Sequence, residues 1–418
     1  MKSRIAPTFF CSKLKLVHPV GTSLLALTLP LFFTTFMCAQ STAPSHSGAT
    51  TQATKTFGQL SQSAQKASDE NRLDDAVRLY SKALAIRPSW VEGWWSLGTL
   101  QYDRNSYAEA ATAFEKLIGL QPKNGMAHAM LGLCEFELGR DGPSLQHLHK
   151  STDLGLNNDE AFWKVVLYHE GVLLQRKGSF QTAQDTLEKL CSLGSHGDEV
   201  ASVLGMTMLR LISKYPPTPG SADADVVIRV GRAECLAGQK KYEEARAAFK
   251  SVVKDNPTFP NVHYAFGLFL EESYDVANGV EQFKQEIANH PDHVLARLRI
   301  AASLYKEDSA AAIPYAEEAV KLSPGMGFAH YLLGLLLLDA DQSARAIPEL
   351  EIAQKTFARD PRIYAALGSA YSRTGRKQAA AQARVTFDRL NKEAEASKKS
   401  GAQAGDMMGI PLGTSPPQ

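Results

Sequence analysis

A pattern of small, aromatic and proline residues recurs every 34 residues along most of this 418-residue chain. Two neighbouring stretches carry matching series, Ala76, Tyr80, Ala83 and Pro88, then Ala110, Phe114, Leu117 and Pro122. Leu-Gly pairs keep the same spacing at Leu97-Gly98 and Leu131-Gly132, and again at Leu333-Gly334 and Leu367-Gly368. A fixed period of this length predicts stacked copies of one small structural unit, which bury their apolar faces against each other.

Each unit reads as two helices. When the residues of a unit are numbered as places, places 4, 7, 8 and 11 are apolar or small, which is the spacing of one helical face. Places 20, 24 and 27 form a second such face. Turn glycines, for example Gly139, Gly178 and Gly375, stand between the two faces, and proline closes many units. The pattern predicts an all-α chain of helical hairpins.

The period and its residues resemble the tetratricopeptide repeat, whose pattern is W-x2-L-G, then A-x3-F, then P. The best-matching copy here consists of Trp94, Leu97, Gly98, Ala110, Phe114 and Pro122. The resemblance implies a right-handed α-α superhelix, or solenoid, of about nine to ten helix pairs, one of them degenerate. The units start at residues 57, 91, 125, 164, 198 (degenerate), 226, 260, 293, 327 and 361.

Glycine occupies place 8 in seven units, although it costs a helix interior about 1 kcal/mol relative to alanine. These residues are Gly98, Gly132, Gly171, Gly205, Gly267, Gly334 and Gly368. We expect close packing of the two helices to offset that cost, with alanine at place 20 as the facing small residue.

The unit that starts at 198 is broken. Its first helix carries Leu204-Gly205, but Pro216, Pro217 and Pro219 stand where a second helix should follow, and they cannot continue a helix. The next helix pair is expected from Ala224 onward. The break is either a neutral loop left by an insertion, which we favour, or a hinge or contact loop between two halves.

The two ends of the chain lie outside the repeats. A basic start and an uncharged run from Gly21 to Cys38 indicate a secretory signal peptide over residues 1–39. An uncleaved membrane anchor is the alternative, and both place the remaining chain on the far side of the membrane. Together with the resemblance, this implies export across the inner membrane to the periplasm or cell envelope. Residues 40–56 are expected to be a flexible linker, residues 57–394 the repeat array, and residues 395–418 a disordered tail.

Composition narrows the class of partner. Lys and Arg number 45 and Asp and Glu 44, so no basic excess favours a nucleic acid. Removal of residues 1–39 lowers the formal charge from +1 to −3. The five cysteines are too few for a disulfide scaffold. Cys134, Cys191 and Cys235, which follow the leader, are expected to be buried apolar residues, with Cys134 and Cys235 too far apart to bond.

Clusters that could carry chemistry fall at joints between units. Ser195, His196 and Asp198 are neighbours, whereas a nucleophilic triad needs a hydrogen-bonded line of side chains. His290 and His293 flank Pro291-Asp292, and we expect a structural joint there in preference to a metal site. His128, His263 and His330 all hold place 4, which predicts packing between helices. The sequence predicts no catalytic residue, metal, cofactor or small-molecule substrate.

The first helices offer a binding surface instead. In tetratricopeptide arrays that bind peptides, places 2, 5, 9, 12 and 13 face the concave side, and large aromatic residues favour binding there. The candidate groove residues are Trp95, Tyr102, Phe136, Tyr168, Tyr264, Phe328 and Tyr331. Packing of some of them into the core is the alternative.

These observations predict a non-enzymatic extracytoplasmic scaffold or assembly factor that binds protein or peptide segments in an aromatic groove. Two alternatives remain open. One is an enzyme that acts on envelope polymers and uses the solenoid as a frame, and the other is an adaptor attached to the membrane by its uncleaved N-terminal segment.

Overall fold

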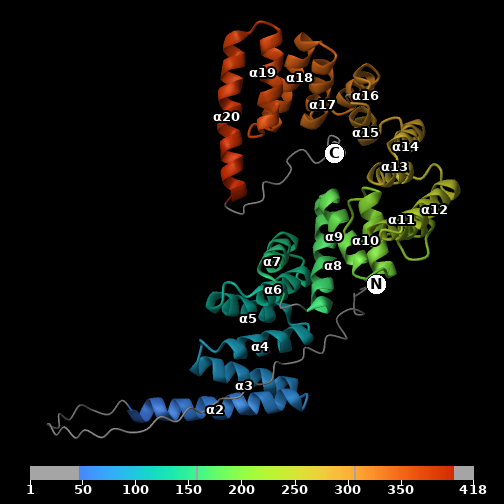
Figure 1. Ribbon diagram of the computed structural model, residues 1–418. Helices are drawn as coiled ribbons and strands as arrows, with labels where there is room; N and C mark the ends of the chain where they lie inside the picture. The colour runs from blue at the N-terminus through green and yellow to red at the C-terminus, as the bar shows by residue number, and fades with distance from the viewer. Residues whose placement is uncertain (1–46, 157–158, 306, 400–418) are drawn as a thin grey trace, which may run out of the picture. The chain divides into compact units, whose positions relative to one another are not determined.

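The computed structural model describes residues 47–156, 159–305 and 307–399. These residues form helices α2 to α20 and contain no strand (Figure 1). The expected all-α class is therefore confirmed for the described part of the chain. The predicted signal peptide lies outside the described residues, as do residues 40–46 of the predicted linker and 400–418 of the predicted tail.

The chain divides into two compact units, residues 1–169 and 170–418, and the boundary falls within α8 (Glu160–Lys177). Helices of the first unit pack in consecutive pairs, as expected of helical hairpins. The pairs are α2 (Ser47–Asp69) with α3 (Leu73–Ile86), α4 (Val91–Asp103) with α5 (Tyr107–Leu120), and α6 (Gly125–Glu137) with α7 (Asp141–Leu154).

The second unit begins with the end of α8 and contains twelve further helices among its described residues. The first four are α9 (Phe180–Ser192), α10 (Asp198–Met208), α11 (Ala222–Gly238) and α12 (Tyr242–Asp255). Four hairpins follow: α13 (Val262–Glu272) with α14 (Val276–Asn289), α15 (Val294–Leu304) with α16 (Ser309–Leu322), α17 (Gly327–Asp339) with α18 (Ser343–Thr356), and α19 (Pro361–Arg373) with α20 (Lys377–Lys399).

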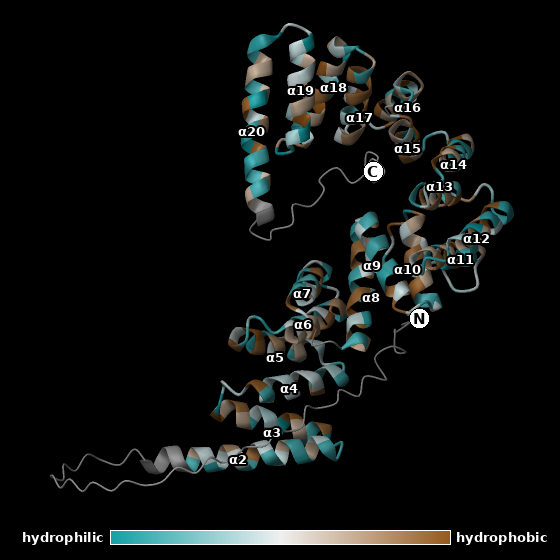
Figure 2. Ribbon diagram, viewed as in Figure 1, coloured by the Kyte–Doolittle hydropathy of each residue, from teal (hydrophilic) through white to brown (hydrophobic). Residues whose placement is uncertain are grey.

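Helix starts follow the repeat phase. Five helices begin at the predicted first residue of a unit: α4, α6, α10, α17 and α19. Both array ends extend further than expected, since residues 47–56 of the predicted linker belong to α2 and α20 continues to Lys399. Once a packed segment has formed a helix, each added residue gains one more backbone hydrogen bond, which explains both extensions. Hydrophilic residues cover most of α20, whereas α17 is largely hydrophobic (Figure 2), as expected of a terminal and an internal helix.

The turn inside most of the described hairpins uses a left-handed backbone conformation. The predicted turn glycines Gly139, Gly178 and Gly375 have φ values of 71°, 78° and 74°. Other hairpins place a residue with a side chain in the same conformation, namely Asn71, Asn105, Lys240, Tyr274 and Asp341. These turns therefore share one geometry, and glycine is one of several residues that adopt it.

The place 8 glycines lie between the two helices of a hairpin, but their partner differs from the expected one. A Cβ added to Gly334 would lie 2.6 Å from Leu350, and a Cβ on Gly267 would lie 2.4 Å from Phe283. Gly98, Gly132 and Gly171 face the corresponding side chain of their own unit in the same way. The large residue at place 24 thus fills the space that glycine leaves, and the expected contact with place 20 alanine is not the main one.

The helices around the broken unit pack in a way that the sequence did not predict. Helix α10 lacks a second helix of its own and packs against α11, which packs against α12 as well. A Cβ on Gly205 would lie 1.8 Å from the Val227 carbonyl oxygen, and one on Gly231 would lie 1.7 Å from that of Ala201. The two backbones therefore touch. This break lies inside the second compact unit, so it is not the boundary between the two.

A disulfide bond joins α9 to α11. Cys191 and Cys235 are bonded, with their Cα atoms 5.4 Å apart. The expectation that both are free apolar residues is wrong, because the missing helix lets α11 pack directly against α9. Cys134 is free and buried, as expected. Burial raises the pKa of its thiol to about 12, so it remains protonated and unreactive.

Candidate functional site

Four of the predicted groove residues are half-buried aromatic side chains of the first compact unit. Trp95 and Tyr102 lie on α4, Phe136 lies on α6 and Tyr168 lies on α8. All four belong to the first helices of successive units. Each residue is partly exposed, which a binding surface requires.

Each of these rings rests against a second aromatic ring. Trp95 packs edge-on against the buried Phe114, with ring centroids 5.8 Å apart, and Tyr102 packs edge-on against Tyr107 at 5.3 Å. His169 contacts Phe136 at 4.7 Å and Tyr168 at 5.4 Å, in both cases near a right angle. Edge-to-face packing is favourable for aromatic rings, and it holds these side chains in one orientation.

The three predicted groove residues of the second unit lie in its core. Tyr264, Phe328 and Tyr331 are 1%, 3% and 4% exposed. Tyr264 packs against Phe283, and burial raises the pKa of Tyr331 to about 12. Their burial does not fit a partner-binding role in this conformation, so the binding surface proposed below is built on the other four residues.

Place 4 has a structural role that repeats along the chain. Nε2 of His128, His263 and His330 lies 2.9–3.1 Å from the carbonyl oxygen six residues earlier, which belongs to Pro122, Pro257 or Pro324. Trp94 Nε1 and Tyr364 Oη donate to the equivalent oxygens, both at 2.8 Å. These side chains tie each first helix to the turn before it, in agreement with the expected packing role.

The Ser195-His196-Asp198 stretch is not arranged as a triad. Asp198 is exposed, and one of its carboxylate oxygens accepts a hydrogen bond from Arg232 Nη2 at 2.6 Å. His196 is exposed at the start of the joint before α10. The carboxylate that would orient the imidazole is therefore engaged with an arginine instead.

The His290 to His293 joint is likewise structural. His293 Nδ1 accepts a hydrogen bond from the Ala296 amide at 2.9 Å and so caps α15, and Nε2 lies 2.6 Å from Asn261 Oδ1. Both ring nitrogens are thus occupied. A different group of metal-ligand type, Glu188, Glu234 and Glu272, converges in the second unit. No sequence pattern predicts this group, because the three residues lie on helices of different units.

Comparison with known families agrees with this geometry. One tetratricopeptide repeat model matches residues 62–125, 96–142 and 331–383, and a second matches residues 230–258. The matches fall in both compact units and coincide with hairpins that the structure contains. The chain therefore contains tetratricopeptide repeats.

Individual proteins resemble it more distantly. The solved structure titled MamA RS-1 ArsTM double mutant is 22% identical, with a TM-score of 0.38, and the match covers 40% of this chain and 95% of that one. MamA 41-end from Desulfovibrio magneticus RS-1 is 24% identical, with a TM-score of 0.37 and coverage of 41% and 96%.

Among curated proteins, the human Protein O-mannosyl-transferase TMTC3 is 20% identical over 227 residues, which are 54% of this chain. The match spans about a fifth of that relative, 22% of its length. Within the described part of this chain, none of the helices has the length and apolar character needed to cross a bilayer.

Proposed function

We propose that this protein is a non-enzymatic scaffold that works outside the cytoplasm and binds segments of partner proteins. Tetratricopeptide repeats present rigid helical surfaces, and repeat proteins of this type act through such extended surfaces. The proposal rests on one observation above all, the four half-buried aromatic residues on first helices of the first compact unit.

These four residues have the chemistry of a peptide-binding surface. Aromatic rings supply large contact areas at low entropic cost, and Tyr and Trp add a polar atom at the edge. The matching ligand is an extended segment or an amphipathic helix that lays its apolar side chains across Trp95, Tyr102, Phe136 and Tyr168. Nearly equal numbers of acidic and basic residues argue against a partner that is mainly recognised by charge.

Two features support a location in the periplasm or cell envelope. The basic and apolar start of the chain has the form of an export signal. The Cys191–Cys235 disulfide suits an oxidising compartment, because disulfides are rare in proteins that stay in the cytosol.

Site-specific photo-crosslinking tests the binding surface in the cell. A photoreactive phenylalanine analogue replaces Tyr102 or Tyr168 in the full chain, and Tyr242, an aromatic residue of α12 that is 48% exposed, serves as the matched control. We expect the same discrete partner at both groove positions and its absence at Tyr242. Identical products at all three positions would contradict the proposal.

Affinity for the captured partner then measures the contribution of the rings. We expect Trp95→Ala and Tyr168→Ala each to weaken binding by about 1–3 kcal/mol, as truncation of aromatic binding residues does, while Tyr242→Ala leaves it unchanged. Thermal melts of each variant establish that the loss comes from the surface and not from unfolding. Unchanged affinity in folded variants would exclude this groove.

A further inference from the structure

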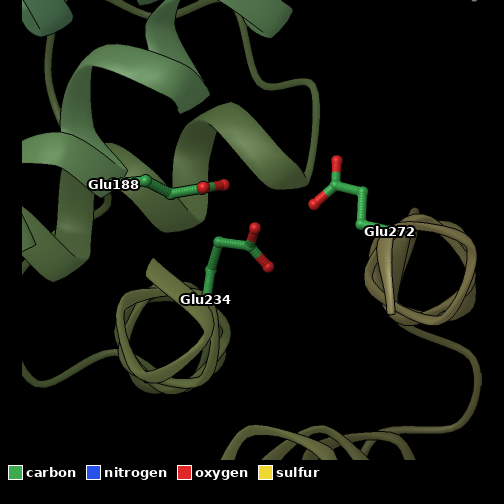
Figure 3. A group of neighbouring side chains, drawn as sticks. All are labelled: Glu188, Glu234 and Glu272. Atoms are coloured by element: carbon green, nitrogen blue, oxygen red, sulfur yellow. The ribbon is translucent and has the colours of Figure 1, made fainter. Parts of the chain in front are cut away.

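Three carboxylates from separate helices meet in the second compact unit. Glu188 lies on α9, Glu234 on α11 and Glu272 on α13, and one oxygen of each lies within 4.8 Å of one oxygen of the others (Figure 3). Glu234 is fully buried, Glu188 is half-buried and Glu272 is exposed, so the cluster runs from the interior to the surface.

The break in the repeat array creates this cluster. With one second helix missing, α11 packs against α9 and also contacts α13. The disulfide fixes the first of these contacts, because Glu234 precedes Cys235 and Glu188 lies about one helical turn before Cys191. Three helices of different units therefore deliver their carboxylates to one point.

A buried glutamine at the same point has more acceptors around its amide nitrogen than that nitrogen can donate to. Gln184 is 1% exposed, and its Nε2 lies 2.8–3.0 Å from four carboxylate oxygens, one each of Glu188 and Glu234 and both of Glu272. An amide nitrogen carries two protons, so it cannot donate to all four.

Two buried oxygens at the cluster also lack a hydrogen-bond partner. They are Oε1 of Gln184 and Oε2 of Glu234, whose side chains are 1% and 0% exposed. A buried acceptor without a partner is destabilising, because it has lost its hydrogen bonds to water. Rotation of the Gln184 amide by half a turn exchanges its oxygen and nitrogen and turns Oε1 toward the carboxylates, an arrangement that needs a positive charge between them.

We propose that this cluster binds a divalent cation, Ca²⁺, through one oxygen each of Glu188, Glu234 and Glu272 and through Oε1 of Gln184. All four are hard oxygen ligands, which Ca²⁺ prefers. Oxygens bound to one Ca²⁺ ion at about 2.3–2.6 Å lie at most roughly 5 Å apart, and the three carboxylate oxygens, all within 4.8 Å of one another, satisfy this limit. The exposed Glu272 leaves room for water to complete the coordination.

Other charges near the cluster do not replace the ion. The positive charge of Arg299 favours the ionised form of Glu272, but Arg299 Nη1 donates its hydrogen bond to Glu271, at 3.2 Å. Asp185 adds a further negative charge close to Glu272. Protons are the natural competitor of the cation at buried carboxylates. Occupancy is therefore expected to rise with pH and to release protons as the ion binds.

Calorimetric titration of the full chain, freed of metal with EDTA, tests the site with CaCl₂, MgCl₂ and MnCl₂ near neutral pH. We expect one saturable Ca²⁺ per chain, with an affinity of about 0.1–1 mM, as for open extracellular sites, and a higher melting temperature in Ca²⁺. Absence of saturable Ca²⁺ binding would overturn the proposal, and tighter binding of Mg²⁺ or Mn²⁺ would overturn the choice of Ca²⁺.

Two variants separate a ligand role from a structural one. Glu234→Gln keeps the shape and removes a buried charge, so in EDTA the variant should melt no lower than the wild type, while its Ca²⁺ affinity falls about tenfold or more. Glu272→Gln should weaken Ca²⁺ binding in the same direction. The matched control is Glu281→Gln on α14, which should bind as the wild type does. Equal Ca²⁺ affinity of Glu234→Gln and Glu281→Gln would refute the site. This test is independent of the aromatic surface, which lies in the other compact unit.

Discussion

Glycines at place 8 differ in how closely other atoms approach them, although they hold equivalent positions in the repeat. At Gly334 an added Cβ would meet Leu350 at 2.6 Å, whereas at Gly368 the nearest atom is the Ala383 Cβ at 3.7 Å. The difference arises because place 24 of the last unit is the exposed Arg384, and the small Ala383 faces Gly368 instead. Glycine is thus required by packing in the internal unit and is dispensable in the last one.

We predict opposite effects for the same substitution at these two glycines. Gly334→Ala forces Leu350 to move and should destabilise the protein by about 1–3 kcal/mol. Gly368→Ala has room and removes the helix penalty of glycine, so it should stabilise by up to about 1 kcal/mol. Chemical denaturation of both variants measures the difference, and equal changes would refute this account of the place 8 glycines.

Glu135 on α6 is a buried carboxyl, 6% exposed, and one of its oxygens lacks a hydrogen-bond partner. Burial raises its pKa to about 7, with a smaller opposing effect of Arg140. The folded state therefore holds this proton more tightly than the unfolded chain, whose glutamates have a pKa near 4.3. Stability from this group is fully present below pH ~4.3 and is lost as pH rises towards 7.

We predict that Glu135→Gln removes this dependence. Compared with the wild type, the variant should gain on the order of 1 kcal/mol in relative stability between pH 5 and pH 8, because it has no buried charge to form. Denaturation at both pH values measures the change, with Glu109→Gln, an exposed residue of α5, as the control. The same pH profile in wild type and Glu135→Gln would contradict the prediction.

Helix α11 is the element that departs most from the repeat. It serves as partner to α10 and as first helix of the pair with α12. Gly231 and Gly205 make its approach to α10 possible, and Cys235 and Glu234 connect it to α9. The close approach of α10, the disulfide and the glutamate cluster therefore all involve α11.

We predict that Gly231→Ala is among the most damaging small substitutions in the chain. The new methyl group would overlap a backbone oxygen, which cannot rotate away as a side chain can. The expected loss is at least about 2 kcal/mol. Gly119→Ala on α5 is the matched control, because nothing lies within 4 Å of its added Cβ, and it should not lower stability. A variant at Gly231 as stable as that control would disprove the backbone contact.

The sequence predicted the helices that follow the repeat, but it did not predict the contacts that form where the repeat is broken. Period and place determine which face of a helix is buried, so the hairpins, their turns and the packing role of His128, His263 and His330 could be predicted. Burial of Tyr264 and Tyr331 could not, because a shift of about one residue in helix rotation decides between groove and core. The Cys191–Cys235 bond and the glutamate cluster depend on α9 meeting α11, a contact that no periodic pattern encodes.

At the scale of the whole molecule, the number of free cysteine thiols indicates two things. It shows whether the protein has met an oxidising compartment, and whether its N-terminal segment has been removed. The chain has five cysteines, of which Cys11 and Cys38 belong to the predicted signal peptide. Alkylation of denatured protein, followed by mass measurement, therefore counts the free thiols with and without reduction. We predict one label without reduction and three after it for protein recovered from the periplasm or envelope.

Other label counts have definite meanings. Three labels before reduction and five after it would show that the N-terminal segment is retained, as in the anchored adaptor. Three before and three after would show a processed chain without the disulfide and would contradict the oxidising location proposed above.

Because the free cysteine and the two bonded cysteines lie in different compact units, the order of folding affects which disulfide forms. Cys134 belongs to the first unit and both bonded cysteines to the second. A chain that emerges from its N-terminus can fold the first unit early, which withdraws the Cys134 sulfur from oxidants before the later two appear. Two thiols then remain, and they have one way to pair. Synthesis from the N-terminus thus disfavours wrong disulfides that involve Cys134. Refolding from a fully denatured, reduced chain should form such disulfides more often.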